Sequence, residues 1–287
     1  MIRYITPNKL SFSAYDTCIE NSLSPRVYAQ HWYLNCVAKN WGVLVLNHYE
    51  AVMPICWNKK FGISYSYTPP WVQQLGIFSS KPMDESMIFA FLEAIPTRFK
   101  KVDLQLNSFN NINHPKIKLR TNLLLNLEDD YQKIYQRFNK NRKRCLKQLA
   151  ALGKDLEIEC IDEAMFLIFF KSVQKKYVVN AASHESIKKL LNSKKGHCIG
   201  VFEGASLLGA LFYFVAHNRI YYLLPLSSAR GLELNVQTLI IDHIIKKFGG
   251  RNYTLDFEGS MVEGVARFYK SFGAKEELYP MLSYWRI

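Results

Sequence analysis

Two carboxylates and a tyrosine near the C-terminal end have the residue types and spacing that acyl transfer to an amine requires. Asp256 and Glu258 are two residues apart at the end of an apolar segment, and Tyr269 follows within a helical pattern. The reaction needs a base for the attacking ammonium and a proton donor for the leaving group. Residues i and i+2 of a strand share a face, so either acid is placed to be the base. We prefer Glu258, because Asp256 is better suited to hold loop structure. Two alternatives remain, in which the acids only cap the strand end and Tyr269 only packs in a core.

A second group of candidates is aromatic and lies in the first half of the chain. Tyr65, Tyr67 and Trp71 are close together in a segment that Pro69 and Pro70 stiffen. Aromatic faces suit a sugar, a peptide or an acyl chain, so we expect these residues to bind the acceptor. The alternative is that they form a contact between two lobes, where aromatic residues also concentrate.

A third group is basic. Residues 133, 137, 140, 144 and 147 are all Lys or Arg and recur at steps of three and four, which places them on one helical face. Together with Arg142, Arg144 is predicted to contact substrate, either the phosphates of a tRNA or a phosphorylated acceptor. The alternative is an ordinary solvated face opposite an apolar stripe.

The elements that must position these residues follow a similar order in both halves. In the first half, apolar periodicity predicts strands at 3–5, 42–47, 51–57 and 102–106 and helices at 26–39 and 85–99. In the second half it predicts strands at 197–203, 207–217, 219–226 and 253–257 and helices at 162–177, 184–192 and 232–248. A strand at 120–127 and a long basic helix at 128–152 join the halves, and a strand at 280–287 ends the chain.

The similar order indicates a duplicated domain. Residues 99–106 resemble residues 250–257, about 150 residues later, which is too long a period for a solenoid. We therefore predict an α/β fold with a mixed sheet (α+β character) in two tandem halves, residues 1–125 and 126–287.

The charge, the cysteines and the apolar runs of the chain indicate which ligands and which kinds of site to expect. The formal net charge of +13 attracts anions such as nucleic acid or the phosphates of a cofactor. The six cysteines have no zinc-ligand spacing, so we predict no metal site, and we expect reduced thiols in the cytoplasm. No apolar run reaches the roughly 18 residues that a membrane span needs.

The segment from Asp256 to Ala274 resembles the last strand and helix of the GNAT superfamily. The resemblance matches Tyr269 to the tyrosine that protonates the departing thiolate of acetyl-CoA, with Phe272 and Gly273 after it. It also implies a pyrophosphate loop before the helix at 232–248. Here that loop keeps Arg230 and Gly231 but carries Leu234 and Val236 where small residues are expected, and Val262 replaces an expected asparagine. Acyl-CoA is thus the implied donor, with Ser228, Arg230, Gly231 and Lys270 as its expected contacts.

Nearly the whole chain resembles the Fem-type peptidyltransferases and the related BioF2-like acetyltransferase domains. The resemblance rests on tandem GNAT-like halves, the basic segment from Lys140 to Leu149, the D-F-x-G-S run that starts at Asp256, and F-x-x-x-F-G from Phe268. It implies aminoacyl-tRNA and a cell-wall precursor as substrates in the Fem branch, and acyl-CoA in the BioF2-like branch. Fem proteins place a lysine directly after the helix phenylalanine. This chain has Tyr269 there and Lys270 one step later, which favours the acyl-CoA branch.

Three functions follow as expectations. The first is an N-acyltransferase in which an amine in the cleft between the halves attacks an acyl-CoA directly. The second is Fem-like aminoacyl transfer from tRNA to a cell-wall precursor. For an acyl transfer in general, we expect an amine-bearing acceptor that is a small molecule, a peptide or a cell-wall precursor. The third is a non-catalytic protein that binds anions or nucleic acid on a degenerate GNAT scaffold.

Overall fold

The computed structural model describes residues 1–151, 156–173, 181–259 and 261–286 and divides into two compact units. Unit 1 is Met1–Thr121 with Glu277–Ile287, and unit 2 is Asn122–Glu276. The sequence division at 125/126 put residues 277–287 in the second half, whereas in the structure they complete the sheet of unit 1. Backbone pairing with a distant strand decides this placement, and hydropathy patterns do not record it.

Unit 1 is a mixed sheet in the order β1-β2-β3-β4-β6-β13, with β5 also paired to β3. Its strands are β1 (Ile2–Ile5), β2 (Asn40–Leu46), β3 (Ala51–Lys60), β4 (Ile63–Ser66), β5 (Phe78–Ser79), β6 (Phe99–Gln105) and β13 (Lys275–Trp285, which begins in unit 2). Its helices are α1 (Phe12–Glu20), α2 (His31–Val37) and α3 (Glu85–Glu93), with single 3-10 turns η1 (Pro7–Lys9) and η2 (Val27–Ala29). The predicted hairpin is present as β2 and β3, which pair from Asn40–Trp57 to Leu46–Ala51.

The helix predicted at 85–99 is shorter than expected. Asp84 caps it by accepting a hydrogen bond from the Met87 backbone N–H at 2.7 Å. It ends at Glu93, and β6 already begins at Phe99. Pro96 lies between the two and cannot continue a helix, which explains the early end. The side chains of α3 and β6 then pack in one apolar core with β2 and β3.

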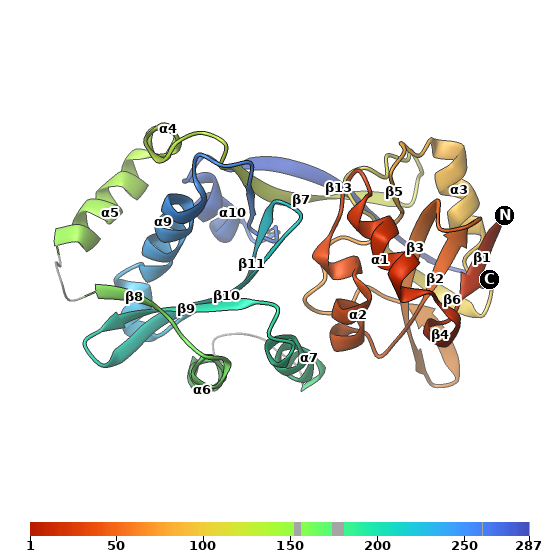
Figure 1. Ribbon diagram of the computed structural model, residues 1–287, viewed down its shortest axis with the longest axis horizontal. Coiled ribbons are helices and arrows are strands. Elements are labelled where there is room, and N and C mark those ends of the chain that lie inside the picture. Colours follow the sequence, from red (N-terminus) through yellow and green to blue (C-terminus); the bar gives the residue numbers. More distant parts are fainter. Residues whose placement is uncertain (152–155, 174–180, 260, 287) are drawn as a thin grey trace. The chain divides into compact units, whose positions relative to one another are not determined.

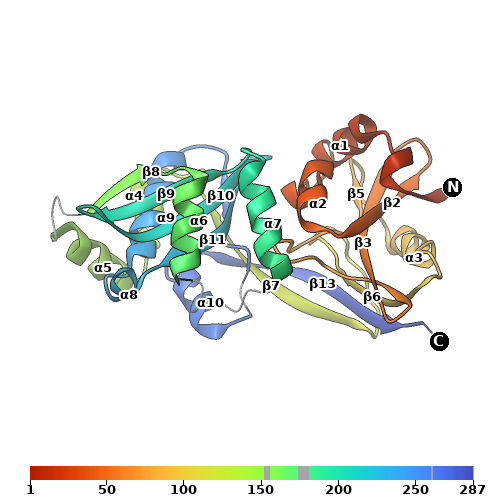
Figure 2. The same cartoon turned by 90° about the horizontal axis from the view of Figure 1, so that it is seen from below.

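Unit 2 is a mixed sheet in the order β7-β12-β11-β10-β9-β8. Its strands are β7 (Ile117–Asn126, which begins in unit 1), β8 (Leu156–Cys160), β9 (His197–Glu203), β10 (Ser206–Ala216), β11 (Arg219–Ser227) and β12 (Thr254–Asp256). Its helices are α4 (Tyr131–Gln136), α5 (Lys140–Ala151), α6 (Glu163–Val173), α7 (Ala181–Asn192), α8 (Ala229–Glu233), α9 (Val236–Phe248) and α10 (Glu263–Lys270). In Figure 1, α9 covers one face of the β9–β11 sheet and α6 the other, and Figure 2 shows α6 crossing these strands beside α7.

The long helix predicted at 128–152 is two helices, α4 and α5. Asp130 caps α4 through the Lys133 N–H at 2.9 Å, and Asn139 starts α5 by accepting from the Arg142 N–H at 2.8 Å. The Asn139 N–H meanwhile donates to the carbonyl of Ser271 at 2.9 Å, so a distant residue holds the break. The prediction of a single helix with five basic residues on one face was therefore wrong.

The helix predicted at 232–248 is also divided. Asn235 adopts a left-handed conformation, with φ 56°, between α8 and α9. Asparagine tolerates this region better than most residues, which allows the sharp turn. The ends of the helices predicted at 128–152 and 162–177 lie outside the described residues, as do Ser260 and Ile287. Among the helices that the structure describes, none is both long and apolar enough to cross a membrane.

Candidate functional site

Strands β11 and β12 separate soon after they begin, and two of the predicted site residues lie at the point of separation. The strands pair in parallel over three residues, from Arg219–Thr254 to Tyr221–Asp256. β11 continues to Ser227, whereas β12 ends at Asp256. Asp256 and Glu258 therefore lie where the chain leaves the sheet to reach α10.

Asp256 is fully buried and engaged at both carboxylate oxygens. Its Oδ2 lies 2.6 Å from Arg219 Nη1, in an ion pair of which the arginine side chain is 14% exposed. Its Oδ1 accepts hydrogen bonds from Asn122 Nδ2 at 3.0 Å and from the backbone N–H of Glu258 at 2.9 Å. A buried charge needs such partners, since an unpaired carboxylate would carry a large desolvation cost. These contacts suit Asp256 to holding the strand end in place.

Glu258 is held in an unusual backbone conformation. Its φ is 61° and that of Gly259 is 70°, so two successive residues occupy the left-handed region. This region is costly for a residue with a long side chain and persists only where neighbours impose it. Asp256 imposes it here through the Glu258 N–H. Strained positions of this kind concentrate at functional sites.

Tyr269 lies on α10 beside this strand end. Its ring stacks on Phe257 with centroids 4.4 Å apart and planes at 15°, and it meets Tyr222 edge-on at 6.0 Å. Phe257 is the residue between the two acids, so the structure brings Tyr269 next to the segment that carries them. Tyr269 is only 6% exposed, and the ring cluster also includes Phe272.

Several backbone N–H groups of the predicted phosphate loop already donate hydrogen bonds to other protein atoms. Ser228 caps α8 by accepting from the Gly231 N–H at 3.0 Å, and the Ser228 N–H donates to the carbonyl of Leu208 at 2.8 Å. The N–H groups of Leu234 and Asn235 also donate within the loop. These donors already have acceptors, so they do not form an open cradle for a pyrophosphate.

The two expected basic contacts of the cofactor are exposed and paired with acids. Arg230 lies 3.5 Å from Glu203 and 3.5 Å from Glu233, and Lys270 Nζ lies 2.5 Å from Glu276. Exposed ion pairs of this kind stabilise a protein by roughly 0–1 kcal/mol, so a phosphate can compete with these carboxylates.

Arg142 and Arg144 have different environments, although both were expected to contact substrate. Arg142 is only 6% exposed: its Nε donates to Ser271 Oγ at 3.1 Å, its Nη1 donates to Thr238 Oγ1, and Phe268 and Phe272 lie against the guanidinium. Burial lowers the pKa of Arg142 from its ordinary value. Arg144 is exposed and donates to Asn141 at 2.9 Å. Only Arg144 is therefore presented on the surface, because α5 turns Arg142 inward against α9 and the end of α10.

The three expected acceptor residues all lie in unit 1. Tyr65 and Tyr67 have ring centroids 6.0 Å apart, and Tyr67 Oη accepts from the Lys39 N–H at 3.3 Å. Burial raises the pKa of Tyr67, so its phenol stays protonated. Trp71 is in the left-handed region with φ 64°, and its carbonyl accepts from Tyr33 Oη at 2.5 Å.

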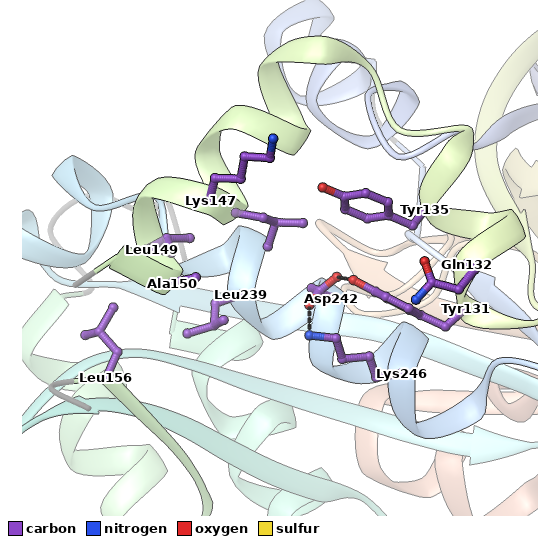
Figure 3. A pocket seen from close by; sticks show the side chains of 11 residues that line it. Tyr131, Gln132, Tyr135, Lys147, Leu149, Ala150, Leu156, Leu239, Asp242 and Lys246 are labelled. Carbon is purple, nitrogen blue, oxygen red and sulfur yellow. Dashed lines mark hydrogen bonds and ion pairs between the residues drawn. The ribbon is translucent and has the colours of Figure 1, made fainter. Parts of the chain in front are cut away.

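Sequence patterns did not indicate a cavity of about 440 Å³ in unit 2, bordered by α4, α5, β8 and α9. Figure 3 shows the side chains that line it: Tyr131, Gln132, Tyr135, Leu146, Lys147, Leu149, Ala150, Leu156, Leu239, Asp242 and Lys246. One signal was available, because Asp242 is a carboxylate on the otherwise apolar face of α9 and is 2% exposed. The described part of the chain contains no cluster of three or more His, Cys, Asp or Glu that fits a metal ion.

Comparisons with known proteins find similarity in structure alone. No family model matches the sequence, and no curated protein matches it. Among solved structures, FemX superimposes with a TM-score of 0.66 at 10% identity, over 97% of this chain and 96% of that one. The fold is GNAT-like and of the Fem type.

Two further solved structures are similar in fold over nearly the whole chain. L-PGS from Bacillus licheniformis gives a TM-score of 0.58 at 10% identity, over 95% of this chain and 91% of that one. A tandem GNAT protein from the clavulanic acid biosynthesis pathway gives 0.56 at 7% identity, over 99% and 98%. The predicted mixed α/β fold is thereby confirmed, and identities this low carry the fold and not the reaction.

Proposed function

We propose that this protein is an acyltransferase that joins an acyl group to an amine at the point where β11 and β12 separate. The observation that carries the proposal is the contact between Tyr269 and the strand end that bears Glu258, with Phe257 and Tyr269 stacked at 4.4 Å. It brings the helix of the Tyr269 phenol next to the segment that carries the Glu258 carboxylate, on a Fem-type fold whose structural relatives include acyltransferases. The two groups are the base and the acid that the reaction requires.

In the proposed reaction, the amine nitrogen attacks the carbonyl carbon of the donor directly. Glu258 takes one proton from the ammonium so that the free amine can form the new C–N bond. The bond from the carbonyl carbon to the leaving sulfur or oxygen then breaks, and the leaving atom takes a proton from the Tyr269 phenol, which recovers one from the nitrogen of the new amide. Asp256 does not exchange protons in this scheme. Its buried pair with Arg219 and its bond to the Glu258 N–H hold the base in position.

Acyl-CoA is the first candidate donor. Side chains would contribute to holding its phosphates, since several backbone N–H groups of the loop, among them those of Ser228 and Gly231, already have acceptors. Arg230 and Lys270 carry the charge for this contact, and their exposed ion pairs can exchange for a phosphate.

Aminoacyl-tRNA is the second candidate donor, and a specific observation favours it. Lys140, Arg144 and Lys147 are exposed on α5, in a chain of net charge +13. Such residues suit the regularly spaced phosphates of a nucleic acid, and each contact would steepen the loss of affinity with salt.

The test is an acyl-transfer assay on the full chain with acetyl-CoA and, in parallel, with charged tRNA, each against a mixture of amine acceptors. We expect Glu258→Gln and Tyr269→Phe to lower the rate by about 10²- to 10⁴-fold, the range of general acid–base catalysis. The matched controls are Glu128→Gln, on an exposed acid, and Tyr253→Phe, on a tyrosine just before the start of β12 whose ring packs against Phe248 and not against Phe257.

The donor that supports turnover decides between the two candidates. Arg230→Ala should weaken the use of acetyl-CoA, whereas Arg144→Ala should weaken the use of tRNA. Wild-type protein inactive with both donors, or Glu258 and Tyr269 variants as active as their controls, would rule out the proposed mechanism.

A further inference from the structure

The cavity in Figure 3 contains a buried carboxylate whose partners are fixed. Asp242 Oδ1 accepts from Tyr131 Oη at 2.7 Å, and Asp242 Oδ2 lies 2.7 Å from Lys246 Nζ. The Asp242 side chain is 3% exposed, whereas that of Lys246 is 56% exposed. Burial, and then Asp242 itself, raise the pKa of Tyr131, so its phenol remains a donor. The negative charge of Asp242 is thus compensated by two residues that line the same cavity, Tyr131 and Lys246.

The opposite side of the cavity is apolar. Leu146 and Leu149 come from α5, Leu239 comes from α9, and Leu156 begins β8. Figure 3 shows Leu149, Leu156 and Leu239 on the side away from the Tyr131–Asp242–Lys246 group. A cavity of about 440 Å³ falls within the range of roughly 300–1,000 Å³ that small-molecule sites occupy. Its division into polar and apolar sides suits an amphipathic ligand.

The uncompensated charge of the lining is positive. Two lysines, Lys147 and Lys246, face one aspartate, and Lys246 already pairs with it. Lys147 is exposed on α5, and in Figure 3 the Tyr135 hydroxyl is directed toward the side of the cavity where Lys147 lies. Lys143 lies 5.5 Å from the centre of the Tyr135 ring and adds to the positive potential there. An ammonium and a phenol on one rim form a site for a carboxylate head.

We propose that this cavity binds an aliphatic carboxylate, with its chain against Leu146, Leu149 and Leu239 and its head beside Lys147 and Tyr135. The site is separate from the residues of acyl transfer, since none of Asp256, Glu258 and Tyr269 lines it. A ligand here would contact α5 and α9 together, which gives unit 2 a second binding function. The proposal does not depend on the acyl-transfer reaction.

Calorimetric titration of the full chain with hexanoate, octanoate and decanoate tests the proposal. Each added methylene that becomes buried should strengthen binding about fourfold. Lys147→Met should weaken decanoate binding by about tenfold, because a charge-assisted contact is lost. Lys140→Met, on an exposed lysine of the same helix that does not line the cavity, should leave it unchanged.

Two further variants keep the test specific. Leu239→Trp fills the cavity without changing its charge and should abolish binding, whereas Tyr269→Phe should bind decanoate as wild type does. In methyl-labelled protein, decanoate should shift the signals of the leucines that line the cavity. No saturable binding of decanoate, equal binding of decyltrimethylammonium, or equal losses in Lys147→Met and Lys140→Met would overturn the proposal.

Discussion

Replacing Asp256 by asparagine should destabilise unit 2 strongly, although the two side chains have nearly the same shape. Asparagine can still accept at Oδ1 from Asn122 and from the Glu258 N–H, at the positions where Asp256 accepts at 3.0 Å and 2.9 Å. At the other position it presents an NH₂ group to Arg219 Nη1, where Asp256 holds its oxygen at 2.6 Å. The amide NH₂ group and Arg219 Nη1 are both donors, so they repel each other, and the Arg219 guanidinium no longer has a negatively charged partner.

The size of the effect follows from burial. Asp256 is fully buried and the Arg219 side chain is 14% exposed, so water can replace little of the lost interaction. Removing one partner of a buried ion pair typically lowers the free energy of unfolding by about 3–5 kcal/mol. For a unit of this size, that corresponds to a lowering of the melting temperature by roughly 6–20 °C.

The chain offers a matched control in a second aspartate–arginine pair. Asp129 and Arg137 lie 2.8 Å apart, but their side chains are 44% and 39% exposed. Asp129→Asn should therefore cost less than about 1 kcal/mol. Urea unfolding followed by circular dichroism measures both variants, and Arg219→Met combined with Asp256→Asn measures the coupling of the buried pair. Equal losses in Asp256→Asn and Asp129→Asn would refute the argument from burial.

Three other substitutions test the packing of unit 2. Arg142→Met removes the donors to Ser271 and Thr238 and should lower the free energy of unfolding in urea by about 2–3 kcal/mol. Arg144→Met, at an exposed position, should change it by less than about 0.5 kcal/mol. Equal effects would contradict the buried position of Arg142. Gly231→Ala would bring a methyl group to 2.1 Å from a backbone oxygen, so thermal unfolding should show a free energy of unfolding lower by at least about 1–3 kcal/mol. Gly264→Ala on α10 meets nothing within 4 Å, so it should be neutral or stabilising. Burial raises the pKa of the Cys198 thiol from 9.0 to about 12, so the unfolded state loses this proton first as the pH rises. The free energy of unfolding should therefore fall between about pH 9 and 12, by up to ~1.4 kcal/mol per pH unit. If Cys198→Ala left the slope of the free energy of unfolding against pH unchanged, that result would argue against this shift.

Local periodicity in the sequence was enough to find most of the elements. The hairpin of β2 and β3, the three strands from β9 to β11 and the helix α9 all lie close to the predicted ranges. Each of them has an alternating or helical apolar pattern that its own residues define. The predicted α/β fold in two tandem halves followed from the order of these elements, whereas its GNAT-like character followed from the resemblance of the segment from Asp256 to Ala274; the fold is confirmed by the structure and its structural neighbours.

Breaks within the predicted helices were not visible in the same way. Asn139 and Asn235 are ordinary polar residues in the sequence, and each turned out to interrupt a helix. At Asn139 the deciding contact is the carbonyl of Ser271, more than a hundred residues away. A pattern of neighbouring residues cannot record a contact of this separation.

For the candidate site, too, the sequence indicated some features, and only the structure showed the others. The motif around Asp256, Glu258 and Tyr269 indicated which residues to examine, and their catalytic roles stay predictions. The sequence could not indicate that Arg219 neutralises Asp256, or that Phe257 carries the contact to Tyr269. For the cavity at Asp242 it offered only one signal, an acid on an apolar helix face, because the lining comes from α4, α5, β8 and α9.

The sequence by itself determined the order of strands and helices, the basic character of the chain and the acidic strand end that precedes the Tyr269 helix, because these depend on residues near one another. Only the tertiary structure decided which polar groups are buried and what they pair with. Arg142 and Arg144 illustrate the difference, since two arginines of one helix lie two residues apart and only one is enclosed. The physical reason is that the free energy of a buried charge depends on partners from distant parts of the chain.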